Sequence, residues 1–316
     1  MSTAASASPL PRPPFAWGQF LALTAGAAAI FALLRLIPTG SDLNHMDFRV
    51  DAKGGQAIEF CDPLNPQFIP VVAVKSPVVM EVAPAVPPVA GRAVAAVVTL
   101  KTARGKAIGP EDLQVTHTRR LHLLAVDPSL ADYQHLHPEP GARPGEWAFT
   151  FTPARPGTYR IFADFTPAAT GRGLYASADV AVAADPGASA APAPVPVAAG
   201  EPLTREGHRY ALDVRPVSAR AGQPLDLRFG VERTDGAAFA LGEVMDAFAH
   251  LVAFDAERSG FAHLHPVVTG PARPGPGPRT ELDFKLTIPR AGRYTIWAQL
   301  SLEGREVFVP FQLEVK

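Results

Sequence analysis

Short runs of alternating apolar and polar residues fill most of the chain after residue 77. An example is LDLRFGV within AGQPLDLRFGV at 221–231, and the matching stretch AGRAVAAVVTL at 90–100 is more continuously apolar. Alternation with a period of two puts one set of side chains on a buried face and the other in solvent, as in a half-buried strand. Turns containing glycine or proline separate the runs, and short strands spaced in this way predict antiparallel β-sandwiches.

The whole pattern occurs twice, in 77–183 (repeat 1) and in 207–316 (repeat 2). The stretch EWAFTFTPARPGTYRIFADF in the first copy matches ELDFKLTIPRAGRYTIWAQL in the second. We therefore predict an all-β body of two tandem immunoglobulin-like antiparallel β-sandwiches. Residues 184–206 between them are rich in proline and alanine, which predicts a semi-rigid, extended linker.

A long apolar segment precedes the repeats. Residues 13–34 carry no charge, and an apolar helix of about 20 residues spans a hydrocarbon core of about 30 Å. We predict a cytoplasmic tail over 1–14, one transmembrane helix over 15–37 and an ordered connector over 38–76. A cleaved signal peptide is the alternative, although its apolar region is usually shorter, about 7 to 15 residues.

Composition narrows the classes of function. The net charge of −1 argues against a nucleic-acid partner, and the 34 prolines disfavour a helix-rich fold. Cys61 is the single cysteine, so neither an internal disulfide nor a zinc site built from cysteines is expected. Cys61 is either a buried thiol or a ligand or partner contact. The chain has no G-x-S-x-G or H-E-x-x-H motif, and we predict that it is not an enzyme.

A histidine motif recurs at the same place in both repeats. QHLHP at 134–138 returns as AHLHP at 262–266. The candidate ligands are His122, His135 and His137 in repeat 1 and His250, His263 and His265 in repeat 2. Strand residues two apart share a face, so each H-x-H pair can bind one metal ion, copper or zinc, with a third histidine from a neighbouring strand. The alternative is structural, with the histidines bonded to backbone carbonyls and to Asp127 or Asp255.

From His122 through HLHP to the RPGTYRIFADF strand, each copy resembles the YtkA-like and FixH-like extracytoplasmic β-sandwich domains and, more distantly, the CopC-like domains. This resemblance implies an immunoglobulin-like fold, a location outside the cytoplasm, and a role in metal handling or in the assembly of membrane redox complexes. The chain departs from the group in its doubled domain, in Gln299 at the position of Asp164, and in lacking a methionine-rich copper-binding run.

Two functions follow from these features. The favoured one is a non-catalytic, single-pass accessory or scaffold subunit of a membrane protein complex of respiratory or photosynthetic type. It would sit in a bacterial inner membrane with its body in the periplasm, and would contact the lipid bilayer and the complex through the helix and residues 38–76. The alternative is a membrane-tethered periplasmic copper- or zinc-binding protein that uses the paired histidine sites.

Overall fold

The computed structural model describes residues 17–36, 66–74, 76–187, 193–267 and 276–316. The predicted tail over 1–14, most of the predicted connector, and Cys61 lie outside the described residues. Contacts divide the chain into two compact units, Met1–Ser41 and Asp42–Lys316, which we treat separately.

The first unit contains one helix, α1 (Trp17–Leu36). Its sequence consists largely of alanine and leucine, which have high helix propensity. Among the described residues, no helix combines the length and the apolar character needed to cross a membrane. The membrane anchor stays a prediction.

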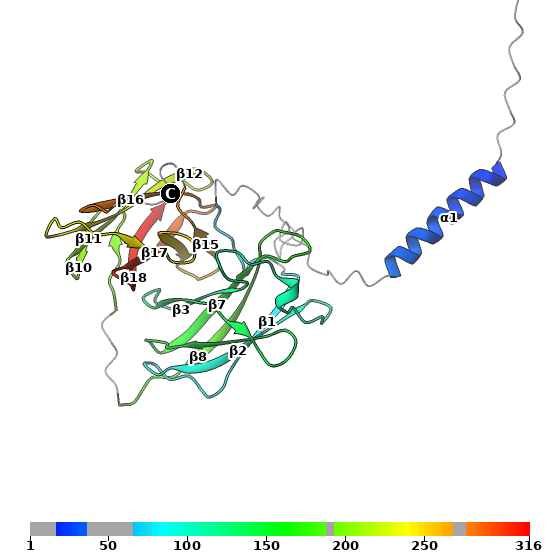
Figure 1. The fold of residues 1–316 in the computed structure, drawn as a ribbon, viewed down its shortest axis with the longest axis horizontal. Helices are drawn as coiled ribbons and strands as arrows, with labels where there is room; N and C mark the ends of the chain where they lie inside the picture. Colours follow the sequence, from blue (N-terminus) through cyan, green and yellow to red (C-terminus); the bar gives the residue numbers. More distant parts are fainter. Residues whose placement is uncertain (1–16, 37–65, 75, 188–192, 268–275) are drawn as a thin grey trace, which may run out of the picture. The chain divides into compact units, whose positions relative to one another are not determined.

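The second unit is mostly β, as predicted, and repeat 1 contributes two four-stranded sheets to it (Figure 1). The first sheet consists of β1 (Val78–Pro84), β2 (Val94–Thr102), β6 (Glu146–Phe151) and β5 (Glu139–Pro140), in that order. The second consists of β4 (Tyr133–Leu136), β3 (His122–Val126), β7 (Gly157–Phe165) and β8 (Leu174–Val182). A short 3-10 helix, Pro110–Asp112, precedes β3. One apolar cluster takes buried side chains from both sheets, including Val98, Trp147, Leu123 and Ile161.

Repeat 2 follows the same plan with longer strands. Its first sheet consists of β10 (Leu203–Arg205), β11 (His208–Arg215), β12 (Pro224–Arg233) and β16 (Arg279–Thr287). Its second consists of β15 (Phe261–Leu264), β14 (Ala249–Asp255), β17 (Gly292–Leu302), β18 (Arg305–Val315) and β9 (Val197–Ala198), and β13 (Leu241–Gly242) pairs with β17. The cluster that joins them includes Leu227, Phe229, Leu251 and Ile296.

The linker between the repeats is shorter than the prediction of 184–206. Two short strands lie within that range, because β9 pairs in parallel with β18 and β10 pairs with β11. Val197 and Leu203 pack on the core of repeat 2. Burial of these two apolar side chains is favourable, and an extended spacer would leave them in solvent.

A third apolar cluster joins the two repeats. Leu124, Val126, Tyr133 and Phe162 of repeat 1 pack with Val252, Phe254, Phe261 and Trp297 of repeat 2. Strands β3 and β14 are therefore buried along their full length on both faces. Burial on both faces explains why their sequences, LHLLAVD and AHLVAFD, are nearly continuous apolar runs.

The described end of the predicted connector packs on repeat 2. The Phe68 amide donates to the Thr287 carbonyl at 2.9 Å, and the Ile69 amide donates to the Phe261 carbonyl at 2.8 Å. A Cβ on Gly260 would stand 1.8 Å from the Ile69 carbonyl oxygen, so this close approach requires glycine. Residues 66–72 thus bind the second repeat although they precede the first in sequence, and Val74 then joins the core of repeat 1.

Candidate metal centre

Strands β3 and β4 bring the three histidines of repeat 1 together. His122 is the first residue of β3, and His135 lies in β4 opposite Leu124. His137 follows directly after β4 and shares the face of His135. One ring nitrogen from each of the three lies within 4.8 Å of the others.

Hydrogen bonds fix the two most buried rings of this set. His122 Nε2 lies 3.1 Å from the carbonyl oxygen of Thr116, and His135 Nδ1 lies 2.9 Å from Gln299 Oε1. The remaining nitrogens, His122 Nδ1 and His135 Nε2, face each other at 3.2 Å. Among the described residues, His137 Nε2 is buried without a hydrogen-bond partner.

Repeat 2 builds the same arrangement on β14 and β15. His250 Nε2 lies 2.8 Å from the Val244 carbonyl oxygen, and His263 Nδ1 lies 3.1 Å from Asp164 Oδ2. His250 Nδ1 and His263 Nε2 again face each other at 3.2 Å. His265 Nε2, like its counterpart in repeat 1, is buried without a hydrogen-bond partner in the described part of the chain.

The outer hydrogen bonds determine where the ring hydrogens sit. A backbone carbonyl only accepts, so His122 and His250 carry their hydrogen on Nε2. The Gln299 amide nitrogen donates to Glu306 at 2.9 Å, which turns its oxygen toward His135 and leaves the hydrogen of that ring on Nδ1. The Asp164 carboxylate places the His263 hydrogen on Nδ1 by the same logic.

In each repeat, therefore, two neutral rings point bare lone pairs at each other. Two lone pairs at 3.2 Å repel unless a cation lies near both. A tetrahedral metal ion with bonds of about 2.0 to 2.1 Å to imidazole nitrogen places its ligand atoms about 3.3 Å apart. Metal-bound histidines commonly donate the other ring hydrogen to a carbonyl or carboxylate, as these do. Both sets could therefore hold a metal ion: one nitrogen pair in each has this spacing, and the third histidine offers a nitrogen within 4.8 Å of the other two.

Burial disfavours a proton as the neutralising cation. It lowers the pKa of His250 to about 4 and, with the neighbouring imidazoles, that of His137 to about 3. Burial also lowers the pKa of His135 and His263 well below the ordinary value, and the surrounding histidines lower it further. The rings are neutral at physiological pH, which is the form that binds metal ions.

Two tight turns supply the carbonyls that orient His122 and His250. Thr116 pairs with Arg119 and Val244 with Ala247. The first corner residue has positive φ in both, 51° at His117 and 50° at Met245, where glycine or asparagine is usual. The His117 ring stacks on His265 with 3.7 Å between centroids. Backbone strain of this kind is concentrated at functional sites in proteins.

All six histidines predicted from the sequence thus belong to the two sets, and the coarse prediction that they could hold a metal ion is confirmed. The aspartates predicted as their partners, Asp127 and Asp255, bond to other groups. Asp127 accepts from the backbone of Ala131 and Asp132, and Asp255 accepts from Ser259. Each carboxylate organises the loop after its own strand.

The residues that orient His135 and His263 do not stand out in the sequence. Asp164 and Gln299 occupy equivalent positions, opposite His122 and His250 in the strand register. Each forms its hydrogen bond with a histidine of the other repeat, although its cross-strand neighbour is a histidine of its own. Their equivalence was visible in the alignment of the two copies, but the exchange between repeats was not.

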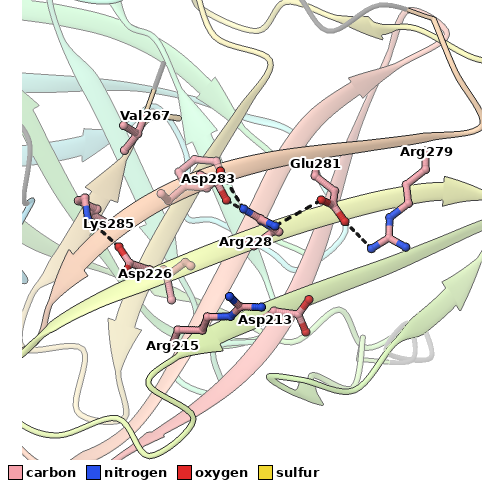
Figure 2. Close-up of a pocket in the computed structure, with 11 residues that line it drawn as sticks. Asp213, Arg215, Asp226, Arg228, Val267, Arg279, Glu281, Asp283 and Lys285 are labelled. Carbon is pink, nitrogen blue, oxygen red and sulfur yellow. Dashed lines mark hydrogen bonds and ion pairs between the residues drawn. The ribbon is translucent and has the colours of Figure 1, made fainter. Parts of the chain in front are cut away.

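Apart from the histidine sets, a concave region lies on the solvent face of the sheet formed by β11, β12 and β16. Figure 2 shows its charged lining, in which Arg228 lies between Asp283 and Glu281, and Lys285 contacts Asp226. The Arg228 Nε to Asp283 Oδ1 distance is 2.7 Å, and the Lys285 Nζ to Asp226 Oδ1 distance is 2.6 Å. These charges neutralise one another, so the surface is a solvated ladder of ion pairs of small energetic value.

Comparisons with solved structures give distant similarities. The red sea bream transglutaminase is 11% identical with a TM-score of 0.24, and the match covers 77% of this chain and 32% of that chain. The Escherichia coli alpha-2-macroglobulin activated by porcine elastase is 14% identical with a TM-score of 0.26, covering 77% and 22%. A DUF4785 family protein from Legionella pneumophila is 11% identical with a TM-score of 0.26, covering 76% and 56%. The chain thus spans less than two thirds of each of these structures.

No curated protein matches the sequence. One family model matches both repeats, over residues 79–183 and 204–316, and its description is a domain of unknown function, DUF8832. Those two segments cover more than half of the chain. The chain therefore belongs to the DUF8832 family and carries two copies of its domain.

Proposed function

We propose that the protein binds metal ions, with one three-histidine site in each repeat. One observation carries this proposal. In both repeats, two imidazole nitrogens face each other at 3.2 Å inside the fold, and the partners of the opposite ring nitrogens assign both of them the form without a hydrogen. A bound cation removes the repulsion between the lone pairs and uses the third histidine, whose Nε2 has no other partner in the described residues.

Copper(II) and zinc are the ions that suit these sites. Imidazole binds both well, and three protein ligands leave one coordination position open for water or a small ligand. Neither set contains a carboxylate or thiolate among its three candidate ligands. A hard, oxygen-preferring ion such as calcium or magnesium is disfavoured for the same reason.

The structural alternative has its own support. His135 and His263 each bond to a side chain of the other repeat, so the histidines also hold the repeats together. That role accounts for the outer hydrogen bonds. It leaves unexplained why the two inner nitrogens face each other and why His137 and His265 turn a nitrogen into the same space.

The test is metal titration of the full chain, purified without a metal-affinity tag. Two equivalents of copper(II) or zinc should bind per chain. His137→Ala and His265→Ala should each lose one equivalent and keep the fold, since the Nε2 of each ring has no hydrogen bond to lose. His208→Ala is the matched control, because the Nε2 of His208 is also buried without a partner among the described residues, yet the ring lies outside both sets. Wild-type protein that binds no metal above background would refute the proposal.

The setting of this activity is a proposal carried by the sequence. The apolar segment around α1 and the resemblance to extracytoplasmic sandwich domains support a membrane-tethered protein with two immunoglobulin-like domains outside the cytoplasm. The accessory-subunit role stays a prediction. Purification in mild detergent should recover stoichiometric membrane partners if that prediction holds, and a lone monomer would contradict it.

A further inference from the structure

The two histidine sets are neighbours in space. Between the sets, ring centroids lie 5.1 Å apart for His135 and His263, 5.8 Å for His122 and His263, and 6.0 Å for His135 and His250. Within the sets, the corresponding distances run from 4.8 to 5.3 Å. By distance alone, the six rings form one cluster, and His117 joins it from its turn.

Each site also depends on the opposite repeat. Gln299 of repeat 2 orients His135 in the first site, and Asp164 of repeat 1 orients His263 in the second. Neither site has its complete set of hydrogen-bond partners within one repeat. The sites therefore belong to the contact between the repeats, where the shared apolar cluster also lies.

The partners make the two sites chemically unequal. In the first site His135 donates to the neutral amide of Gln299, and in the second site His263 donates to the carboxylate of Asp164. A carboxylate bonded to the far nitrogen of a ligating imidazole makes the ring a stronger donor to the metal. The turns also differ. His117, in the turn of repeat 1, stacks on His265 of the second site, and the equivalent position in the turn of repeat 2 is Met245, which has no imidazole ring.

We propose that the two sets form one dinuclear metal centre shared by the repeats, in which the site of His250, His263 and His265 binds its ion more tightly. This inference rests on the proposed function. Protein sites that bind two metals hold them about 3.5 to 4 Å apart, and rings this close can hold two ions as neighbours. Repulsion between two adjacent dications separates their affinities further.

Copper(II) is the probe that tests the inference, because its unpaired electron reports on a nearby second ion. The full chain is titrated with copper(II) and followed by electron paramagnetic resonance. One equivalent should give the signal of an isolated ion. At two equivalents, the integrated signal should fall clearly below two spins per chain, or a half-field transition should appear. Two bound ions with two full, independent spins would overturn the dinuclear centre and leave the metal-binding function intact.

Isosteric variants test the order of binding. Asp164→Asn should weaken the tighter equivalent by about 10-fold to 100-fold, the usual effect of losing such a hydrogen-bond partner, and bring the two affinities together. Asp179→Asn is the control, because this carboxylate lies on the adjacent strand and pairs with Arg160. Removal of the tighter equivalent by His265→Ala and of the weaker one by His137→Ala supports the order. The opposite assignment, or equal affinities in the wild type, overturns it.

Discussion

The neutral, buried histidines predict that the metal-free protein loses stability in mild acid. Burial lowers the pKa of His250 to about 4 in the folded protein, whereas an unfolded histidine titrates near 6.5. Between these two pKa values the unfolded state binds a proton that the folded state does not. The free energy of unfolding is therefore highest above pH 6.5 and falls as the pH drops toward 4. The difference of about 2.5 pKa units corresponds to about 3 kcal/mol in total, and about 2 kcal/mol of this is lost between pH 7 and pH 5.

The assay is urea unfolding of the full chain with a chelator present, at half-unit steps from pH 7 to pH 5. This range excludes most carboxylate titration. The slope should decrease by about one proton in His250→Gln, and His135 and His263 add to the wild-type slope in the same direction. An unfolding free energy that stays flat or rises on acidification would refute the reasoning, since the facing nitrogens would then share a proton in the fold.

Three further predictions concern the stability of the two repeats, each measured as the urea midpoint of the full chain. Gly260→Ala should cost about 2 kcal/mol or more, because its Cβ would stand 1.8 Å from the Ile69 carbonyl. Gly230→Ala, whose Cβ would meet its nearest neighbour at 3.9 Å, should cost less, and equal losses would contradict the steric argument. Phe254→Ala should cost about 3 to 5 kcal/mol, because the fully buried ring fills the contact between the repeats; a loss below 1 kcal/mol would mean that the repeats do not rely on this contact. Tyr159→Phe should cost about 1 to 3 kcal/mol through its lost hydrogen bonds to a carboxylate and a backbone amide, and a neutral result would show that water replaces them.

The sequence predicted the coarse fold because its signals are local. Alternation marks strands such as β12, in which the apolar Leu225, Leu227 and Phe229 are buried and the polar residues between them are exposed, and glycine turns separate the strands. The histidine sets were predictable for the same reason, since the H-x-H spacing fixes a shared face. The continuous apolar runs of β3 and β14 carried a further signal, burial on both faces, which points to packing between the repeats.

The rest of the site depends on contacts that no local pattern encodes. Asp164 is separated by 99 residues from His263, and Gln299 by 164 from His135. Which surface of one repeat meets which surface of the other follows from the fit of side chains such as Phe162 and Trp297. The docking of residues 66–72 on repeat 2 has the same origin, because Phe68 and Ile69 are apolar but their partners are remote in sequence.

The exchange of Asp164 and Gln299 across the contact has a consequence for how such a chain arises. Equivalent residues reach reciprocally across the interface, which is the pattern of an isologous dimer with a two-fold axis. Two separate copies of one domain, each with the same residue at this position, would meet in the same way and form two identical sites. Joining the copies in one chain frees each half to change alone. An acidic residue in one half and an amide in the other, or histidine in one turn and methionine at the equivalent position of the other turn, is a distinction that a symmetric dimer cannot make.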